Sequence, residues 1–136
     1  MGSGGPATLV EGHERCGSCR MAVSDGRTAA QLVVPGGKPV FFDDIACLRT
    51  WLVRSPAVPP GAVAFVADHR TGSWVRAKQA TYAEVPSLRT PMMSHLVAHA
   101  DAASRDADPS ARDGKPMTAA EVFAPARVPD GASPGR

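Results

Sequence analysis

The sequence predicts a small domain of the α+β class, in which short strands are combined with a few short helices. Two observations support this prediction. Short apolar runs recur along the chain between turns that contain Gly and Pro, a pattern typical of strands. One further segment has the signature of a helix, because Asp43-Asp44 can cap it and its apolar residues share one helical face, namely Ile45, Leu48 and Leu52. A length of 136 residues suits one compact domain.

The first half of the chain predicts a β-hairpin followed by this helix. Residues 28–34 and 40–42 have the composition of strands, and Pro35-Gly36-Gly37-Lys38 between them is a turn. The helix is expected over residues 45–53. The Pro-rich stretch over residues 54–61 then breaks the pattern and indicates a boundary between two halves.

The second half predicts further strands and weaker helical segments. Alternation over residues 91–100 indicates a strand that places Met93, His95 and His99 on one face and Met92 on the other. The other expected elements are strands over 62–67, 74–75 and 79–85, a weakly helical segment over 101–112, a turn and short strand over 114–117, and a helical turn ending at Phe123. We expect a flexible lead or tag over residues 1–12, one domain over 13–124 with halves of about 13–58 and 59–124, and a disordered tail over 125–136.

Composition and charge exclude several functional classes. The formal net charge is +2 and basic residues are dispersed, so we expect no nucleic-acid partner. No apolar run approaches the roughly 20 residues that span a bilayer, and the first residues lack the apolar region of a signal peptide. No arrangement of a nucleophile with its base is recognisable, and therefore we do not expect an enzyme.

The cysteines carry the strongest chemical signal. Their number, three, is odd, which favours metal or redox chemistry over a disulfide framework. Cys16, Cys19 and Met21 place three sulfur atoms within six residues. Thiolates and thioethers are soft donors that select Cu(I), whereas zinc seldom takes a thioether. The alternative is a thiol redox couple between Cys16 and Cys19 with Met21 in the core.

One short loop rarely encloses a metal, so a second segment should contribute. Residues 91–95 are the best candidate, through either Met92 or Met93, with His95 or His99 as weaker candidates. The other polar or sulfur-containing residues have simpler interpretations. His13 and His69 are expected to be solvated loop residues. Asp43 and Asp44 are expected to cap the helix, with the orientation of a metal ligand as the alternative role. Cys47 is expected to be a small buried apolar residue, with contact to the metal as the alternative.

Four segments, taken in order, resemble the NosL family of copper lipoproteins, which are accessory to nitrous oxide reductase maturation. The similarity runs from about residue 14 to residue 123. Two positions depart from the family pattern, since Arg20 and Met93 stand where the family usually has Gly. The four segments are Cys16-x-x-Cys19-x-Met21, Val40-Phe41-Phe42-Asp43-Asp44-Ile45-Ala46-Cys47, Asp68-His69-Arg70-Thr71-Gly72-Ser73-Trp74-Val75, and Thr90-Pro91-Met92.

The resemblance implies two small related ββα-type halves packed together, a fold shared with organomercurial lyases. It also implies a metallochaperone-like protein that binds Cu(I) through Cys19, Met21 and Met92, with Cys16 next. The implied partner is a copper-accepting protein or a membrane copper-maturation complex outside the cytoplasm. A lipid anchor in the native precursor and a monomeric state are further expectations. The functional alternatives are an organomercurial-lyase-like enzyme, a small thiol redox protein and a metal-free interaction module.

Overall fold

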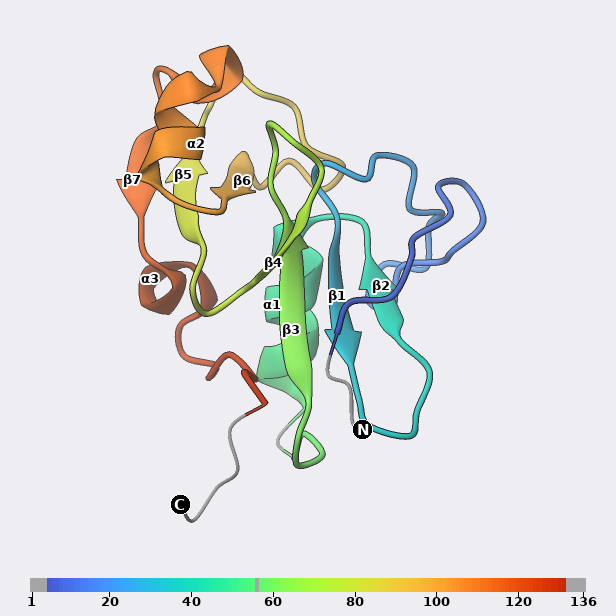
Figure 1. Ribbon diagram of the computed structural model, residues 1–136. Helices are drawn as coiled ribbons and strands as arrows, with labels where there is room; N and C mark the ends of the chain where they lie inside the picture. Colours follow the sequence, from blue (N-terminus) through green and yellow to red (C-terminus); the bar gives the residue numbers. More distant parts are fainter. Residues whose placement is uncertain (1–4, 56, 132–136) are drawn as a thin grey trace.

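The chain folds into two antiparallel sheets with α1 packed against strands of both (Figure 1). The computed structural model describes residues 5–55 and 57–131. Every helix in these two ranges is too short or too polar to span a bilayer. The combination of two small antiparallel sheets with a few short helices confirms the α+β class and the two small ββα-like halves.

The first sheet has the strand order β2-β1-β3-β4, and every neighbouring pair is antiparallel. It extends past residue 58, where the sequence placed the boundary between halves, because β3 pairs with β1 from Ala30–Val66 to Val33–Val63. The β3 strand is buried along its whole length. The first sheet and the helix beside it consist of β1 (Ala30–Val33), β2 (Val40–Phe42), α1 (Ile45–Arg54), β3 (Val63–Ala67) and β4 (Trp74–Arg76).

The second sheet has the order β6-β5-β7 and is also antiparallel. Helix α3 begins with a capping box, in which Thr118 and Glu121 exchange hydrogen bonds between side chain and backbone. Tyr82 on β5 packs edge-on against Phe123 on α3 and closes this half. The second sheet and the helices around it consist of β5 (Thr81–Glu84), β6 (Leu96–His99), α2 (Ala102–Ala107), the 3₁₀ helix η1 (Pro109–Ala111), β7 (Lys115–Met117) and α3 (Ala119–Phe123).

The strand expected over residues 91–100 is wrong in its first half. Strand β6 covers only Leu96–His99, and residues 91–95 form a turn. Met93 and His95 have positive φ values of 56° and 62°, which strand pairing does not allow. The turn forms because Asp44 accepts hydrogen bonds from the Met92 backbone N–H at 2.9 Å and the Ser94 hydroxyl at 2.6 Å.

Described residues near both ends of the chain make contacts that the sequence did not predict. Within the expected flexible lead, Ala7 exchanges two hydrogen bonds with the buried side chain of Gln31 on β1. Within the expected disordered tail, residues 125–131 follow β3, with Ala64 donating to Pro129 and Gly131 donating to Ala62. The tail is ordered here because β3 offers it backbone partners. Residues 1–4 and 132–136 lie outside the described residues.

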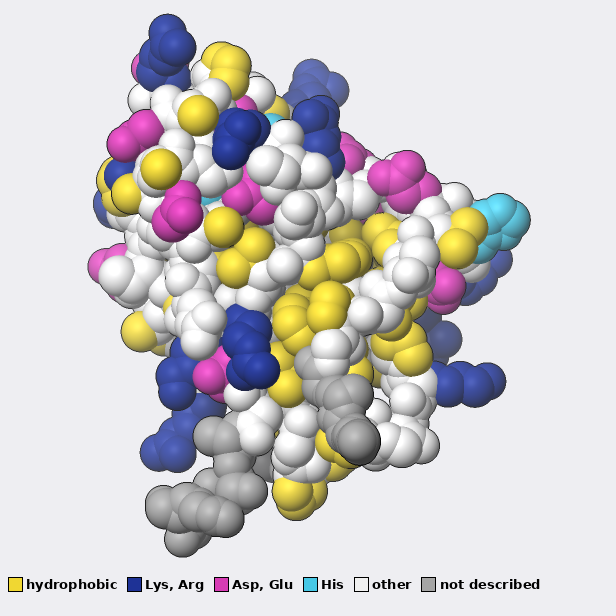
Figure 2. Space-filling model, viewed as in Figure 1, with side chains coloured by type: hydrophobic (Ala, Val, Ile, Leu, Met, Phe, Trp, Pro, Cys, Tyr) yellow, Lys and Arg dark blue, Asp and Glu magenta, His cyan; other side chains and the backbone are white. Residues whose placement is uncertain are grey.

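Charged side chains are dispersed over the surface. On the face seen in Figure 2, Lys and Arg side chains lie at scattered points, and Asp and Glu side chains stand between them. No single-sign field covers this face. The polar groups that matter most for chemistry are instead buried, and they gather at two places described below.

Candidate metal centre

The segment from Cys16 to Met21 forms a tight loop that presents two thiols. The Cys16 backbone N–H donates to the Met21 carbonyl at 2.8 Å, and the Arg20 N–H donates to the Cys16 carbonyl at 3.0 Å. Inside the loop, the backbone N–H groups of Ser18 and Cys19 point at the Cys16 sulfur from 3.4 Å. Backbone N–H groups directed at one sulfur stabilise a thiolate there.

This loop is fastened directly to β2. Gly17 donates to the Phe41 carbonyl at 2.8 Å, and Cys16 and Phe41 form an isolated parallel bridge. A Cβ atom at position 17 would overlap with Cγ1 of Val40 and lie 3.3 Å from the Phe42 ring. Glycine is therefore required at position 17 for the loop to approach the strand this closely.

We expect Gly17→Ala to displace the thiol loop and to lower the free energy of unfolding by about 1–3 kcal/mol, because the added methyl group overpacks this contact. Metal affinity should fall as well, since the loop holds two thiols. The matched control is Gly37→Ala, where the new Cβ would meet only Val34 at 3.6 Å. Chemical denaturation of both variants measures the difference, and equal stabilities would contradict the packing argument.

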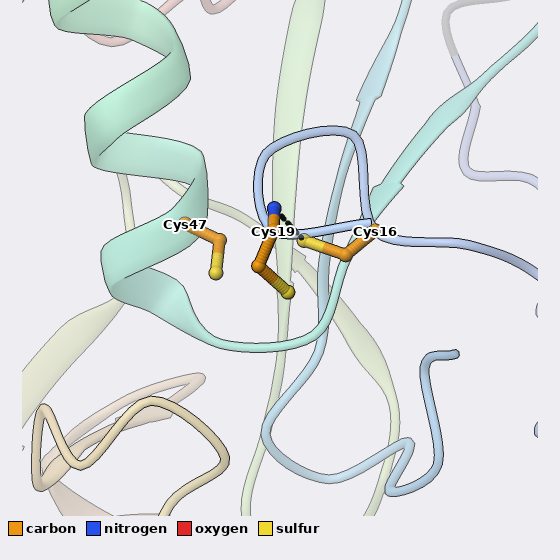
Figure 3. A group of neighbouring side chains, drawn as sticks. All are labelled: Cys16, Cys19 and Cys47. Atoms are coloured by element: carbon orange, nitrogen blue, oxygen red, sulfur yellow. Dashed lines mark hydrogen bonds between the residues drawn. The ribbon is translucent and has the colours of Figure 1, made fainter. Parts of the chain in front are cut away.

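A third thiol comes from α1. Asp44 caps this helix by accepting from the Ala46 N–H at 2.9 Å, which places Cys47 in the first turn. The sulfur atoms of Cys16, Cys19 and Cys47 all lie within 4.8 Å of one another. In Figure 3 the three side chains extend into the same space between the loop and the helix. A small shift would bring all three sulfurs to one metal ion.

The three thiols differ in protonation. Hydrogen bonding from the Cys47 thiol, with further help from the backbone N–H groups of Cys19, Asp43 and Ser18, lowers the pKa of Cys16 to about 4. The same contact with Cys16 raises the pKa of Cys47, and burial raises the pKa of Cys19. The hydrogen bonds therefore favour Cys16 as the thiolate of the cluster and keep Cys19 and Cys47 protonated in the absence of metal. A metal bound by all three sulfurs would displace two protons.

Access to the cluster differs between its members. Cys16 and Cys47 are 1% and 3% exposed, whereas Cys19 is partly exposed. Asp43, next to the cap residue, is also buried, and its Oδ1 atom has no hydrogen-bond partner among the described residues. Burial raises the pKa of its carboxyl group. A ligand or partner can therefore reach the cluster most directly at Cys19.

The methionines predicted as ligands have exposed side chains. Met21 is 62% exposed and closes the thiol loop through its carbonyl. Met92 is 45% exposed, and Asp44 anchors its backbone near the start of α1. The alternation over residues 91–100 would place one of Met92 and Met93 in the core, and this is wrong because Met93 is 56% exposed as well. Ligation by Met21 or Met92 stays a prediction.

The burial of the histidines differs in part from the expectation. His13 is exposed, as expected, and His95 interacts with the Leu88 carbonyl at 2.9 Å. His69 was expected to be solvated but is buried, because its ring interacts with Asp108. His99 contacts the same carboxylate, so it belongs to a separate group of side chains.

One comparison with known proteins identifies the family of this chain. The NosL family model matches residues 6–125. The chain belongs to the NosL family. Neither the curated proteins nor the solved structures give a match. NosL membership points to a copper-related accessory function, and the three-cysteine cluster can hold a metal ion.

Both departures from the NosL pattern occur where the backbone favours glycine. Arg20 has φ of 69° and Met93 has φ of 56°. Glycine adopts this left-handed conformation without strain, whereas a residue with a Cβ atom pays about 1 kcal/mol or more. The hydrogen bonds that flank each position impose the same turn on the larger residue.

Sequence reasoning favoured a core position for Cys47 over contact with metal and left it out of the predicted ligands. Its burial agrees with that assignment, but its sulfur faces Cys16 and Cys19. Two signals in the sequence pointed to it. A protein zinc site needs at least three protein ligands, and Cys47 lies in the first turn after the helix cap, close to the end of β2.

Proposed function

We propose that this NosL protein carries one Cu(I) ion as cargo and passes it to a copper-accepting protein outside the cytoplasm. The observation that carries the proposal is the convergence of three cysteine sulfurs from two separate elements, the loop at Cys16–Cys19 and helix α1. Nitrous oxide reductase maturation is the pathway in which this hand-over would take place.

The donor set favours Cu(I) over harder ions. The group that converges within 4.8 Å contains sulfur alone, without imidazole or carboxylate. Soft thiolates select Cu(I), and zinc in structural sites nearly always takes four ligands. Three sulfurs with one thiolate already formed at Cys16 therefore suit a three-coordinate soft ion.

The same geometry supports release of the ion. Cys19 is the accessible member of the cluster, and the exposed thioether of Met21 lies two residues beyond it. Thioethers bind more weakly than thiolates. In our mechanism a thiolate of the acceptor replaces Cys19, while Met21 and Met92 guide the ion across the surface.

The test is an anaerobic titration of the reduced chain with Cu(I) in the presence of a chromophoric competing chelator. We expect one equivalent to be retained, because three sulfurs converge at one place. Cys19→Ser should abolish this retention, and an excess of Zn²⁺ should not displace the copper.

Met21→Leu is the matched control, because it removes a sulfur outside the cluster and keeps the side-chain volume. This variant should retain one equivalent of Cu(I) with weaker affinity and unchanged stability. Copper binding by Cys19→Ser equal to that of the parent would show that the thiol cluster is not the site. Complete loss of copper to the chelator by the parent would contradict the carrier proposal itself.

One observation favours a second candidate, organomercurial cleavage. The Asp43 carboxyl is buried with an unpartnered Oδ1, and its backbone N–H faces the sulfur of Cys16. In this reaction the thiolates would hold Hg²⁺ while a carboxylic acid protonates the carbon that leaves it. Incubation with phenylmercury separates the two candidates, because only a lyase releases benzene.

A further inference from the structure

A second group of buried polar side chains lies apart from the thiols. His69, His99 and Asp108 are 6%, 0% and 4% exposed. The Nδ1 atom of His69 and the Nε2 atom of His99 each lie 2.8 Å from the same carboxylate oxygen, Oδ2 of Asp108. The two rings are nearly perpendicular, at 79°, so they approach the oxygen from different directions.

The backbone holds the three residues firmly. His69 follows β3, and its N–H donates to the Ala98 carbonyl at 2.8 Å. His99 is the last residue of β6 and pairs with Thr81 on β5. Asp108 caps η1 through its other oxygen, Oδ1, which accepts from the Ser110 N–H at 3.0 Å. This cap leaves Oδ2 free for the two rings.

One polar atom of this group has no hydrogen bond. The Nδ1 atom of His99 is buried and has no partner among residues 5–55 and 57–131. An unsatisfied buried polar atom destabilises a fold by about 1–3 kcal/mol. An apolar residue at position 99 would avoid this cost. This nitrogen faces away from Asp108, because Nε2 is the ring atom that contacts the carboxylate, so a bound metal would be held by the other three atoms.

The donor atoms match those of a divalent metal site. One ligand atom from each of the three residues lies within 4.8 Å of the others. Two imidazole nitrogens and one carboxylate oxygen form a common set for zinc and related ions. Without metal, Nδ1 of His69 and Nε2 of His99 both point at Oδ2 of Asp108. A bound cation would take the place of the protons that these two nitrogens share with the carboxylate.

We propose that His69, His99 and Asp108 form a second metal site, which binds a divalent cation of borderline softness such as Zn²⁺. The site would leave the soft Cu(I) ion to the thiols, because nitrogen and oxygen donors prefer harder ions. A bound cation would also join the end of β3 to β6 and η1, and so would tie the first sheet to the second half.

The experiment uses the full reduced chain with one equivalent of Cu(I) added, so that the thiols are occupied. Zn²⁺ is then titrated while NMR follows the ring nitrogens of all four histidines. We expect one equivalent of Zn²⁺ to shift one ring nitrogen of His69 and one of His99, leaving His13 and His95 unchanged. The ring signals report on this site whether or not copper occupies the thiols, so failure of the carrier proposal is recognised separately.

Asp108→Asn should weaken Zn²⁺ binding by more than about a hundred-fold, since even outer-shell changes cost about 10–100-fold. His69→Gln is the second variant if Asp108→Asn does not fold. His95→Gln is the matched control and should bind Zn²⁺ as the parent does. The proposal is overturned if Zn²⁺ shifts no ring nitrogen of His69 or His99, or if both site variants bind it with parental affinity.

Discussion

Cys47→Ser is expected to lower the affinity for Cu(I) by more than about a hundred-fold, because loss of a ligand should exceed the roughly 10–100-fold effect of outer-shell changes. The sulfur of Cys47 lies within 4.8 Å of the other two sulfurs, and no sequence motif connects it to them. Its removal also withdraws the thiol that stabilises the Cys16 thiolate. Competition with a chromophoric chelator measures the change in affinity.

Met92→Leu is the comparison for this variant. It removes a sulfur that is 45% exposed and preserves an apolar side chain. If the three cysteines are the ligands, Met92→Leu should change the affinity much less than Cys47→Ser. A larger effect at Met92 than at Cys47 would instead favour the set of Cys19, Met21 and Met92 that the sequence resemblance implies. Thermal unfolding of both variants checks that a loss of affinity for Cu(I) does not come from a loss of folded structure.

Asp44→Ala is expected to lower the free energy of unfolding by about 3 kcal/mol, the combined effect of a lost helix cap and newly unsatisfied buried groups. The fully buried Asp44 carboxylate accepts hydrogen bonds from Ala46, Met92 and Ser94. It therefore caps α1 and holds the turn before β6 at the same time. Urea denaturation monitored by circular dichroism measures the loss.

Asp101→Ala is the matched control, because Asp101 also caps a helix but is exposed. Its side chain is exposed and accepts from the Ser104 N–H at 2.9 Å. Loss of a cap alone should cost about 1 kcal/mol. Equal losses at the two positions would mean that the bonds from Asp44 to Met92 and Ser94 add nothing to stability.

These two predictions concern one region, because Asp44 and Cys47 lie in the same helical start. Asp44 fixes the first turn of α1, and this turn carries Cys47 towards the thiol loop. Asp44 also holds the backbone of Met92, a residue with an exposed side chain, next to that turn. We therefore expect Asp44→Ala to weaken Cu(I) binding in addition to lowering stability.

Local sequence patterns determined the hairpin, the main helix and the thiol loop. Pro35-Gly36-Gly37-Lys38 specifies a turn between β1 and β2, and the apolar spacing predicts α1 to within one residue at its end. The pair Cys16 and Cys19 was recognisable because both thiols belong to one short loop. Each of these features depends on neighbours in sequence, and such features can be predicted from local composition.

Only the tertiary structure decided which distant residues share a site. Cys47 reaches the thiols because β2 delivers α1 next to the loop that Gly17 fastens to the same strand. The turn at residues 91–95 replaces a strand because Asp44, far away in sequence, binds its backbone. His69, His99 and Asp108 converge because β3 meets β6 through the His69–Ala98 hydrogen bond. These contacts join residues that are remote in sequence, and periodicity carries no information about such pairs.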